Sequence, residues 1–506
     1  MTEQDLLKLQ NGSDIRGIAL DGVEGERINL TEEACLKIGG AFAQWLSRKT
    51  KKSAQNLTVG IGRDSRVSGP ALENALVKGL SANGVRVVRC GMATTPAMFM
   101  SIVFEKTHFD GSVMITASHL PFNRNGVKFF DADGGLEHKD ITEILELAAA
   151  QGAEKNNSVS ISDCQEFNLI DVYAAHLRNA ICTGLNTAES EKPLSGLKIV
   201  VDSGNGASGF FVDKILQPLG ADTSGSQFLE PDGMFPNHIP NPENKAAMQA
   251  IQNATVRNNA DLGLIFDTDV DRMSAVLSNG EEVNRDAIIA LVAAILAPDC
   301  PGSTIVTDSV TSDRLTYFLE DVLHLKHLRY MRGYKNVINK QKELNAAGTV
   351  CPLAMETSGH GALKENYFLD DGAYLAVKMI VALAQAKKSG KSLESLIEKL
   401  PPLVEEGEYR FKIEAPDFKE YGAQVLAEFK SRAEKEGIVM PQNFEGVRLS
   451  FKGEDVRGWI LLRMSLHDPV MPMNIEGERS GDLEKLVKIA QKLLRGFEQL
   501  DTSCLK

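Results

Sequence analysis

Three aspartates at alternate positions are the strongest chemical signal in the sequence. Asp267, Asp269 and Asp271 directly follow residues 262–266, an apolar run that is typical of a buried strand. Neighbouring carboxylates repel one another unless a cation neutralises them, and carboxylate oxygens suit a hard ion such as Mg²⁺. Ligand sites in open α/β sheets gather at the carboxyl ends of strands. We therefore expect these aspartates to bind Mg²⁺, and an acidic surface turn is the weaker alternative.

A serine at the end of another apolar run is the candidate nucleophile. Residues 111–116 are typical of a buried strand and lead into a turn of small residues that carries Ser118 and His119. Taken alone, such a turn is more often a helix cap or an ST-turn. A serine attacks phosphorus poorly without a base or a metal that stabilises charge on the transferred group. The triple aspartate therefore favours phosphoryl chemistry at Ser118.

These two segments need a scaffold of buried strands joined by helices. Strand-like apolar runs alternate with helix-like segments for most of the chain, which predicts parallel or mixed sheets with crossover helices. The expected strands lie at residues 57–61, 85–90, 111–116, 197–202, 262–266 and 304–307. The expected helices lie at residues 32–46, 69–82, 170–181, 285–297 and 373–388.

Chain length and helix-breaking residues together predict four domains. A chain of 506 residues is longer than one compact core needs. Pro401 and Pro402 end a helix, and the strand-like runs that follow indicate an antiparallel α+β domain. We expect an α/β fold with three similar mixed-sheet domains and a smaller C-terminal α+β domain. Their limits are predicted at residues 1–165, 166–283, 284–402 and 403–506.

The charge, hydropathy and cysteine content of the chain limit its expected binding partners and its expected cellular compartment. A formal net charge of -13 argues against a general nucleic-acid binder, because nucleic acid rewards basic surfaces. We expect no membrane partner, since no apolar run is long enough to span a bilayer and the N-terminus lacks the pattern of a secretory signal. The seven cysteines include no Cys-x-x-Cys pair, so neither a zinc site nor a disulfide framework is indicated. We therefore expect a reducing, cytoplasmic compartment.

The serine and aspartate segments resemble the phosphoserine loop and the metal loop of the α-D-phosphohexomutase superfamily, which includes phosphoglucomutases and phosphomannomutases. The resemblance extends along nearly the whole chain. Each further segment taken alone could be a turn or a surface ion pair, whereas their common order and spacing are much more specific. The matching segments lie at residues 13–17, 62–66, 125–128, 202–206, 231–243 and 355–360. The resemblance implies four domains around a central cleft.

The resemblance also implies the chemistry. Ser118 would carry the phosphoryl group, and Ser118 and the three aspartates would bind an Mg²⁺ ion that draws off charge during transfer. Lys128 would act as general acid or base at the sugar hydroxyl, with His360 as a second candidate. His119 and Arg16 complete the expected catalytic residues. The expected substrate-binding residues are Arg272, Glu356, Ser358, Arg463, Ser465 and His467.

The C-terminal phosphate-binding loop departs from the pattern of the superfamily. That pattern has the form Arg-x-Ser-Gly-Thr-Glu-Pro, with a further arginine three residues after the proline. Here Arg463 and Ser465 are kept, Leu466 and His467 replace Gly and Thr, and Pro472 replaces the later arginine. Leu466 would crowd a close backbone approach to phosphate, and Pro472 removes a charged donor. A protonated His467 would compensate in part.

These departures leave two enzymatic hypotheses and one non-enzymatic hypothesis. The protein interconverts hexose 1-phosphate and hexose 6-phosphate through a hexose 1,6-bisphosphate, or it makes glucose 1,6-bisphosphate from a sugar bisphosphate or acyl phosphate donor. Weaker binding of the distal phosphate favours release of the bisphosphate, and therefore favours the synthesis of glucose 1,6-bisphosphate. A non-catalytic sensor of sugar phosphates is disfavoured because the nucleophile and the metal ligands are present. The sequence distinguishes neither glucose from mannose nor a monomer from a homodimer.

Overall fold

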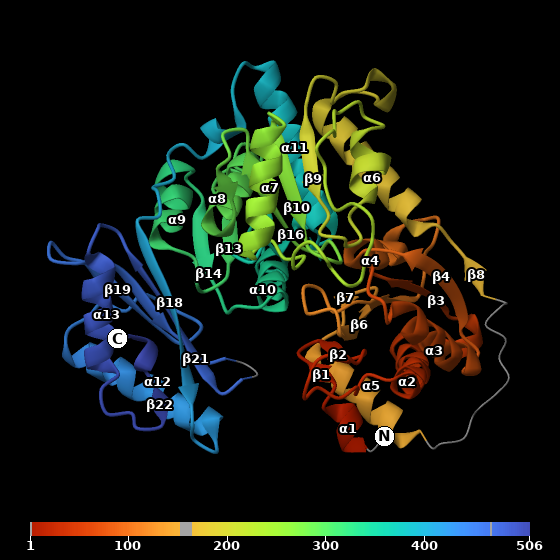
Figure 1. The fold of residues 1–506 in the computed structure, drawn as a ribbon, viewed down its shortest axis with the longest axis horizontal. Coiled ribbons are helices and arrows are strands. Elements are labelled where there is room, and N and C mark those ends of the chain that lie inside the picture. Colours follow the sequence, from red (N-terminus) through yellow and green to blue (C-terminus); the bar gives the residue numbers. More distant parts are fainter. Residues whose placement is uncertain (1–2, 152–163, 466–467, 506) are drawn as a thin grey trace. The chain divides into compact units, whose positions relative to one another are not determined.

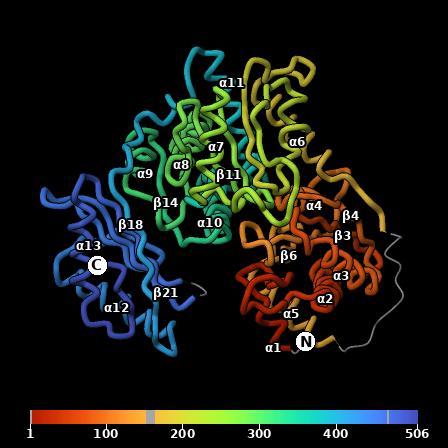
Figure 2. The backbone as a smooth tube through the Cα atoms, in the orientation of Figure 1, coloured from red at the N-terminus to blue at the C-terminus, as the bar shows by residue number. Residues whose placement is uncertain are grey.

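The computed structural model describes residues 3–151, 164–465 and 468–505 (Figure 1). The chain divides into two compact units. Unit 1 comprises Met1–Asn284, Ser358–Gly361 and Leu369–Leu393. Unit 2 comprises Arg285–Thr357, Ala362–Phe368 and Glu394–Lys506. Figure 2 shows the path of the backbone in the same orientation. The chain returns to unit 1 twice after it has entered unit 2. His360 and Asp370 therefore belong to the same unit as the three aspartates.

The first sheet of unit 1 carries the serine segment. Its strand β5 runs parallel to β3 and antiparallel to β6. The sheet is therefore mixed, and Lys128 of β6 lies opposite Met114, shortly before the turn that holds Ser118. The strand order is β1 (Gln10–Asn11), β2 (Asp14–Ile18), β6 (Arg124–Asp131), β5 (Gly111–Ile115), β3 (Thr58–Arg63), β4 (Arg86–Met92) and β8 (Gln165–Glu166), and β7 (Gly134–Gly135) pairs with β6.

Helices pack on this sheet around one apolar core, which includes Phe42, Leu76, Val113 and Ile144. Helices α2 and α3 lie against one another, and a Cβ on Gly39 of α2 would lie 2.4 Å from the carbonyl oxygen of Leu76 in α3. A side chain at position 39 would therefore push the two helices apart. The helices with residues in this core are α1 (Glu3–Leu7), α2 (Glu32–Thr50), α3 (Gly69–Ala82) and α5 (His138–Ala150). Helix α4 (Thr95–Val103) is buried but contributes no residue to it.

The second sheet of unit 1 carries the aspartate segment. Strand β10 (Leu262–Phe266) is buried along its whole length and runs parallel to β9 (Ile199–Asp202). It pairs antiparallel with β11 (Met273–Leu277), which in turn pairs with β12 (Glu282–Val283). The helices of this part of the chain are α6 (Leu169–Leu185), α7 (Lys245–Arg257) and α11 (Gly372–Lys388).

Unit 2 begins with a third α/β layer. Strand β13 runs parallel to both β14 and β15. The strand order is β14 (Lys326–Arg329), β13 (Thr304–Thr307), β15 (Leu353–Met355) and β16 (Gly361–Leu363), and the chain re-enters unit 1 at β17 (Leu369–Asp370). The helices are α8 (Arg285–Leu296), α9 (Asp313–Tyr317) and α10 (Tyr334–Ala346).

The C-terminal part of unit 2 is an antiparallel sheet with two helices. Strand β18 alternates exposed and partly or fully buried residues, the period-2 pattern of a strand with one solvent face. The strand order is β19 (Val447–Lys452), β20 (Arg457–Leu462), β21 (Val470–Gly477), β18 (Glu405–Ile413) and β22 (Leu500–Asp501). Helices α12 (Phe418–Lys435) and α13 (Asp482–Leu493) cover its apolar face, and Phe429 of α12 packs in one core with Leu449 of β19 and Ile460 of β20.

The architecture confirms the predicted fold class, which is three α/β layers and a C-terminal α+β region. The predicted strands at 262–266 and 304–307 match β10 and β13, and the predicted helix at 285–297 matches α8 to within one residue. The exact domain limits stay predictions. In the described ranges, no helix combines the length and apolar character needed to cross a bilayer. All seven cysteines lie in these ranges as free thiols.

Candidate active site

The three aspartates lie on the turn between β10 and β11. Phe266 pairs with Met273, so residues 267–272 turn the chain through a short loop. Val270 has a φ of 67°, a left-handed conformation that β-branched residues rarely adopt. Its carbonyl accepts the N–H of Gly372 at 3.1 Å, which ties the turn to the start of α11. The turn is therefore held in a strained shape by contacts within unit 1.

The geometry of the aspartates fits a hard cation. Asp267, Asp269 and Asp271 are at most 1% exposed, and one oxygen from each lies within 4.8 Å of the others. The Oδ1 atoms of Asp269 and Asp271 are buried and accept no hydrogen bond from the described residues. Burial and the two neighbouring carboxylates raise the pKa of Asp267 well above its usual value. Three carboxylates that offer oxygen ligands at this spacing suit Mg²⁺.

Ser118 lies directly against this cluster. Its Oγ donates a hydrogen bond to Asp267 Oδ2 at 2.8 Å and accepts one from Arg272 Nη2 at 3.1 Å. The residue is 3% exposed and has a φ of 52°, again in the left-handed region. The structure thus brings together the predicted nucleophile and a predicted metal ligand from two different sheets.

His119 and Arg272 lie beside the serine hydroxyl. Arg272 is 2% exposed, its Nε lies 3.3 Å from Asp267 Oδ2, and its Nη2 donates to His119 Nδ1. Burial and the charge of Arg272 lower the pKa of His119 to about 2. His119 is therefore a neutral imidazole at physiological pH, and it can bind a ligand without carrying a positive charge.

Two predicted cationic residues come from the first sheet. Lys128 on β6 places its Nζ 2.6 Å from Asp271 Oδ2 and 3.1 Å from Asp269 Oδ2. Arg16 on the adjacent strand β2 pairs with Asp14 at 3.0 Å. Strands β2 and β6 approach closely at Gly126, where a Cβ would lie 2.5 Å from the carbonyl oxygen of Ile15. A glycine is therefore needed at position 126 to bring these two strands together.

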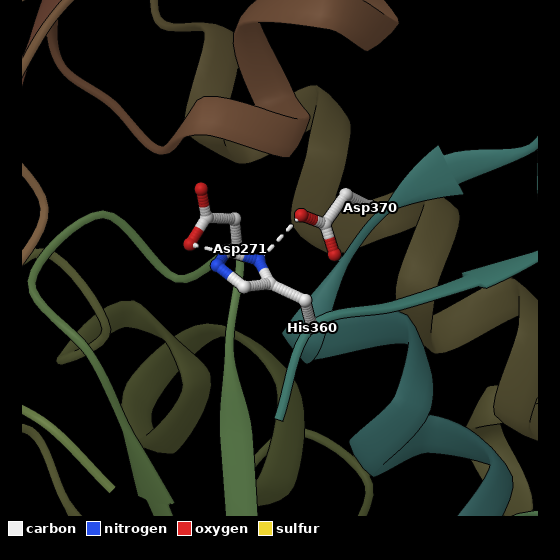
Figure 3. A group of neighbouring side chains, drawn as sticks. All are labelled: Asp271, His360 and Asp370. Atoms are coloured by element: carbon white, nitrogen blue, oxygen red, sulfur yellow. Dashed lines mark hydrogen bonds and ion pairs between the residues drawn. The ribbon is translucent and has the colours of Figure 1, made fainter. Parts of the chain in front are cut away.

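His360 enters the site with a carboxylate on either side (Figure 3). Its Nδ1 lies 2.5 Å from Asp370 Oδ2 and 3.8 Å from Asp271 Oδ1. Burial disfavours the charged imidazole, but the carboxylates of Asp370 and Asp271 outweigh it and raise the pKa of His360 to about 9. His360 is therefore an imidazolium in this arrangement, and it adds positive charge to the aspartate cluster.

Sequence reasoning missed three residues that support the site. Thr95, the first residue of α4, donates from Oγ1 to Asp269 Oδ2 at 2.5 Å and from its N–H to the Asp269 carbonyl at 2.9 Å. Asp370 orients His360, and Glu243 lies 3.8 Å from Arg272. The Thr-Thr-Pro start of α4 is a recognisable helix N-terminus, but nothing local indicates its distant partner.

The remaining predicted residues lie at other positions. In unit 1, Ser358 is buried, and its hydroxyl forms no hydrogen bond with the described residues. In unit 2, Glu356 accepts the N–H of Gly333 at 2.6 Å. Arg463 is 9% exposed and lies 3.9 Å from Glu445, and Ser465 Oγ accepts the N–H of Asp468 at 3.2 Å.

The predicted phosphate loop is only partly described. Leu466 and His467 lie outside the described residues. Pro472 lies inside β21, opposite Arg410 of β18, so it belongs to a paired strand of the sheet. Its carbonyl accepts the N–H of Arg463 at 3.1 Å. Pro472 therefore pairs through its carbonyl with the start of the loop at Arg463, and it supplies no backbone N–H of its own.

The fold and the acidic cluster define an α/β protein with a candidate metal centre. Comparison of the chain with known protein families identifies α/β domains along most of its length. Residues 8–156 match the family described as phosphoglucomutase/phosphomannomutase, alpha/beta/alpha domain I. Residues 171–280 and 284–404 match domains II and III of the same description.

Individual proteins resemble the chain over nearly its full length. It is 30% identical over 480 residues to the phosphomannomutase/phosphoglucomutase of Pseudomonas syringae pv. tomato, covering 94% of this chain and 92% of that protein. It is 29% identical over 478 residues to a phosphoglucomutase of Neisseria gonorrhoeae, covering 94% of both. A solved structure of a family protein from Burkholderia thailandensis shares the fold with a TM-score of 0.77 at 24% identity, covering 98% of both chains. The chain therefore belongs to the phosphoglucomutase/phosphomannomutase family of the α-D-phosphohexomutase superfamily.

Proposed function

We propose that the protein is a hexose-phosphate mutase in which Ser118 carries the phosphoryl group in transit. The observation that supports this most directly is the hydrogen bond from Ser118 Oγ to Asp267, within a buried cluster of three carboxylates. Membership of the family supports the same activity, since relatives are named phosphoglucomutase and phosphomannomutase. Glucose and mannose phosphates are both substrates to test.

The metal site would consist of Asp267, Asp269, Asp271 and the Ser118 oxygen. Bound Mg²⁺ would supply charge stabilisation at the phosphoryl oxygens. Arg272, with its Nη2 3.1 Å from Ser118 Oγ, would add a fixed positive charge at the same place. The local cations Arg272, Lys128 and His360 would allow a chain with a net charge of -13 to receive an anionic substrate.

The transfer itself exchanges one oxygen–phosphorus bond for another. The bond between phosphorus and Ser118 Oγ breaks, a bond forms between phosphorus and the free hydroxyl oxygen of the hexose monophosphate, and the hydroxyl proton ends on Ser118 Oγ. Lys128 and His360 are the candidate carriers of that proton. The resulting hexose 1,6-bisphosphate then returns its other phosphoryl group to Ser118 by the reverse exchange, which leaves the isomeric monophosphate.

A second candidate function is synthesis of glucose 1,6-bisphosphate from a sugar bisphosphate or acyl phosphate donor. The position of Pro472 in β21 favours it, because a proline there supplies neither a backbone N–H nor the arginine cation that would hold the distal phosphate. A weaker hold on that phosphate would let the bisphosphate leave before it reorients.

One set of assays separates these functions. Purified protein with Mg²⁺ is incubated with glucose 1-phosphate or mannose 1-phosphate, with and without catalytic bisphosphate, and with fructose 1,6-bisphosphate as donor. Rapid isomerisation supports the mutase, whereas accumulating glucose 1,6-bisphosphate with little isomerisation supports the synthase. Tight ligand binding without turnover in any mixture would indicate a sensor. Fractionation of cells would test the expected cytoplasmic location, and sedimentation would decide between monomer and homodimer.

A further inference from the structure

The backbone N–H and carbonyl of Ser118 are both linked to one buried ion pair, Asp64 and Arg66. Arg66 binds the carbonyl directly, and Asp64 reaches the N–H through Thr116. The Ser118 N–H donates to Thr116 Oγ1 at 2.8 Å, and that hydroxyl donates to Asp64 Oδ2 at 2.7 Å. The Ser118 carbonyl accepts a hydrogen bond from Arg66 Nη2. Asp64 and Arg66 are both fully buried, and Arg66 Nε lies 3.3 Å from Asp64 Oδ2. The serine backbone is therefore fixed from both sides.

The guanidinium of Arg66 also holds the rest of the serine loop. Besides Ser118, it donates to the carbonyls of Leu120 at 2.6 Å, Pro121 at 2.7 Å and Arg124 at 2.9 Å. A fully buried arginine is unfavourable unless its charge and its donors are compensated. Here Nη1 and Nη2 donate to four backbone carbonyls, and Nε lies 3.3 Å from Asp64 Oδ2. The planar fork of a guanidinium can bridge several acceptors at once, which a lysine ammonium cannot do in the same geometry.

This arrangement matters because Ser118 adopts an unfavourable backbone conformation. Its φ of 52° lies in the left-handed region, which is unfavourable for a residue other than glycine. The same conformation directs Oγ to Asp267 at 2.8 Å. If the loop relaxed, the hydroxyl would move away from the aspartate cluster and from Arg272.

We propose that Asp64 and Arg66 are positioning residues that hold Ser118 in its reactive orientation. Neither side chain contacts a reacting atom. The inference rests on the proposed function of Ser118 as phosphoryl carrier. A positioning role differs from a purely structural role in one measurable way. Loss of positioning slows phosphorylation of the molecules that are still folded, whereas loss of stability only reduces the number of folded molecules.

The test is single-turnover labelling of the protein with ³²P from a hexose 1,6-bisphosphate, measured per folded molecule. Arg66→Ala should slow labelling on the order of 100-fold, the effect expected of a misplacement of about 1 Å. Added guanidinium ion at millimolar concentration should restore part of the rate by occupying the vacated site. Arg66→Lys should remain slow, since one ammonium cannot bridge the four carbonyls.

Arg448 provides a matched control. It is also a fully buried arginine, paired with Asp313 at 3.0 Å and donating to the carbonyl of Ser309 at 3.1 Å, and it belongs to unit 2. Arg448→Ala should lower the melting temperature, leave the labelling rate per folded molecule unchanged, and show no response to guanidinium.

The outcomes separate the two proposals. Labelling of Arg66→Ala at the wild-type rate, or slow labelling that guanidinium does not restore, overturns the positioning role. If Arg66→Ala does not fold, Thr116→Val provides the test, because valine keeps the side-chain volume and removes the link between Asp64 and the Ser118 N–H. Labelling of Thr116→Val at the wild-type rate would overturn the inference. Ser118→Ala is labelled in parallel, and if it still accepts phosphate, the proposed function itself is wrong.

Discussion

Lys128 Nζ lies 2.6 Å from Asp271 Oδ2, so a side chain from the first sheet of unit 1 neutralises a carboxylate on the second. The same ammonium lies 3.1 Å from Asp269. Burial alone would raise the pKa of Asp271, but the charges of Lys128 and His360 outweigh it and lower that pKa below its usual value. A divalent cation at the aspartates would face this ammonium at close range.

Replacing Lys128 by methionine should therefore strengthen metal binding while it abolishes activity. Removing one positive charge relieves repulsion of the cation, and we expect Mg²⁺ or Mn²⁺ to bind roughly tenfold more tightly. Titration calorimetry measures the affinity, and the mutase assay measures turnover. Lys128→Arg, which keeps the charge, should not show the gain in affinity. Weaker metal binding by Lys128→Met would contradict the electrostatic argument.

Thr95 should act on the metal through Asp269. Its hydroxyl donates to Asp269 Oδ2 at 2.5 Å, so Thr95→Val removes a hydrogen bond that orients a metal ligand. Loss of such an outer contact typically lowers metal affinity about 10-fold or more. Thr94→Ala is the neighbouring control, because the Thr94 hydroxyl caps α4 by accepting the Ala97 N–H at 3.2 Å, whereas the Thr95 hydroxyl donates to Asp269. Equal affinities for the two variants would argue against this role for Thr95.

A histidine away from the metal cluster should make stability depend on pH. Nε2 of His238 lies 3.0 Å from Asp202 Oδ1, and Nδ1 lies 2.9 Å from the carbonyl of Ile239. Both ring nitrogens face acceptors, so the folded state favours the doubly protonated imidazolium. Burial opposes the charge, but the hydrogen bond and charge of Asp202 outweigh it and raise the pKa of His238.

The sign of the pH dependence follows from that raised pKa. The contribution of His238 is fully present below the unfolded pKa of about 6.5 and is lost as pH rises through the higher folded pKa. Wild type should therefore exceed His238→Gln in unfolding free energy by on the order of 1 kcal/mol at pH 6, and the difference should shrink toward pH 9. Thermal unfolding at a series of pH values measures this. With Asp202→Asn as the background, the pH dependence of the difference should disappear.

Thiol reactivity should follow burial. Burial raises the pKa of Cys35 and Cys90 to about 12, which leaves almost no thiolate at pH 8, whereas Cys504 is exposed. A disulfide reagent should modify Cys504 rapidly in the native protein and reach Cys35 and Cys90 only in denaturant. Cys504→Ser should remove that rapid reaction. Mass spectrometry of the labelled peptides identifies each site, and early labelling of Cys35 would contradict the packing of α2.

The local pattern of the sequence was sufficient for the elements that carry the chemistry. The apolar run at 262–266 is β10, and the three aspartates lie on the turn that directly follows it. The run at 111–116 corresponds to β5 to within one residue. Hydrophobic periodicity reports burial directly, so strands and crossover helices could be predicted together with the α/β class.

The partners of those residues were decided only by the tertiary structure. Ser118 and Asp267 are 149 positions apart, and Thr95 and Asp269 are 174 positions apart. Arg66 is an ordinary turn residue in the sequence, and only the packed loop shows that its guanidinium meets four carbonyls. Residue type and spacing determine which groups are available and which strand end they follow. Contacts between strand ends depend on how two sheets pack, and a one-dimensional pattern of polarity does not contain that information.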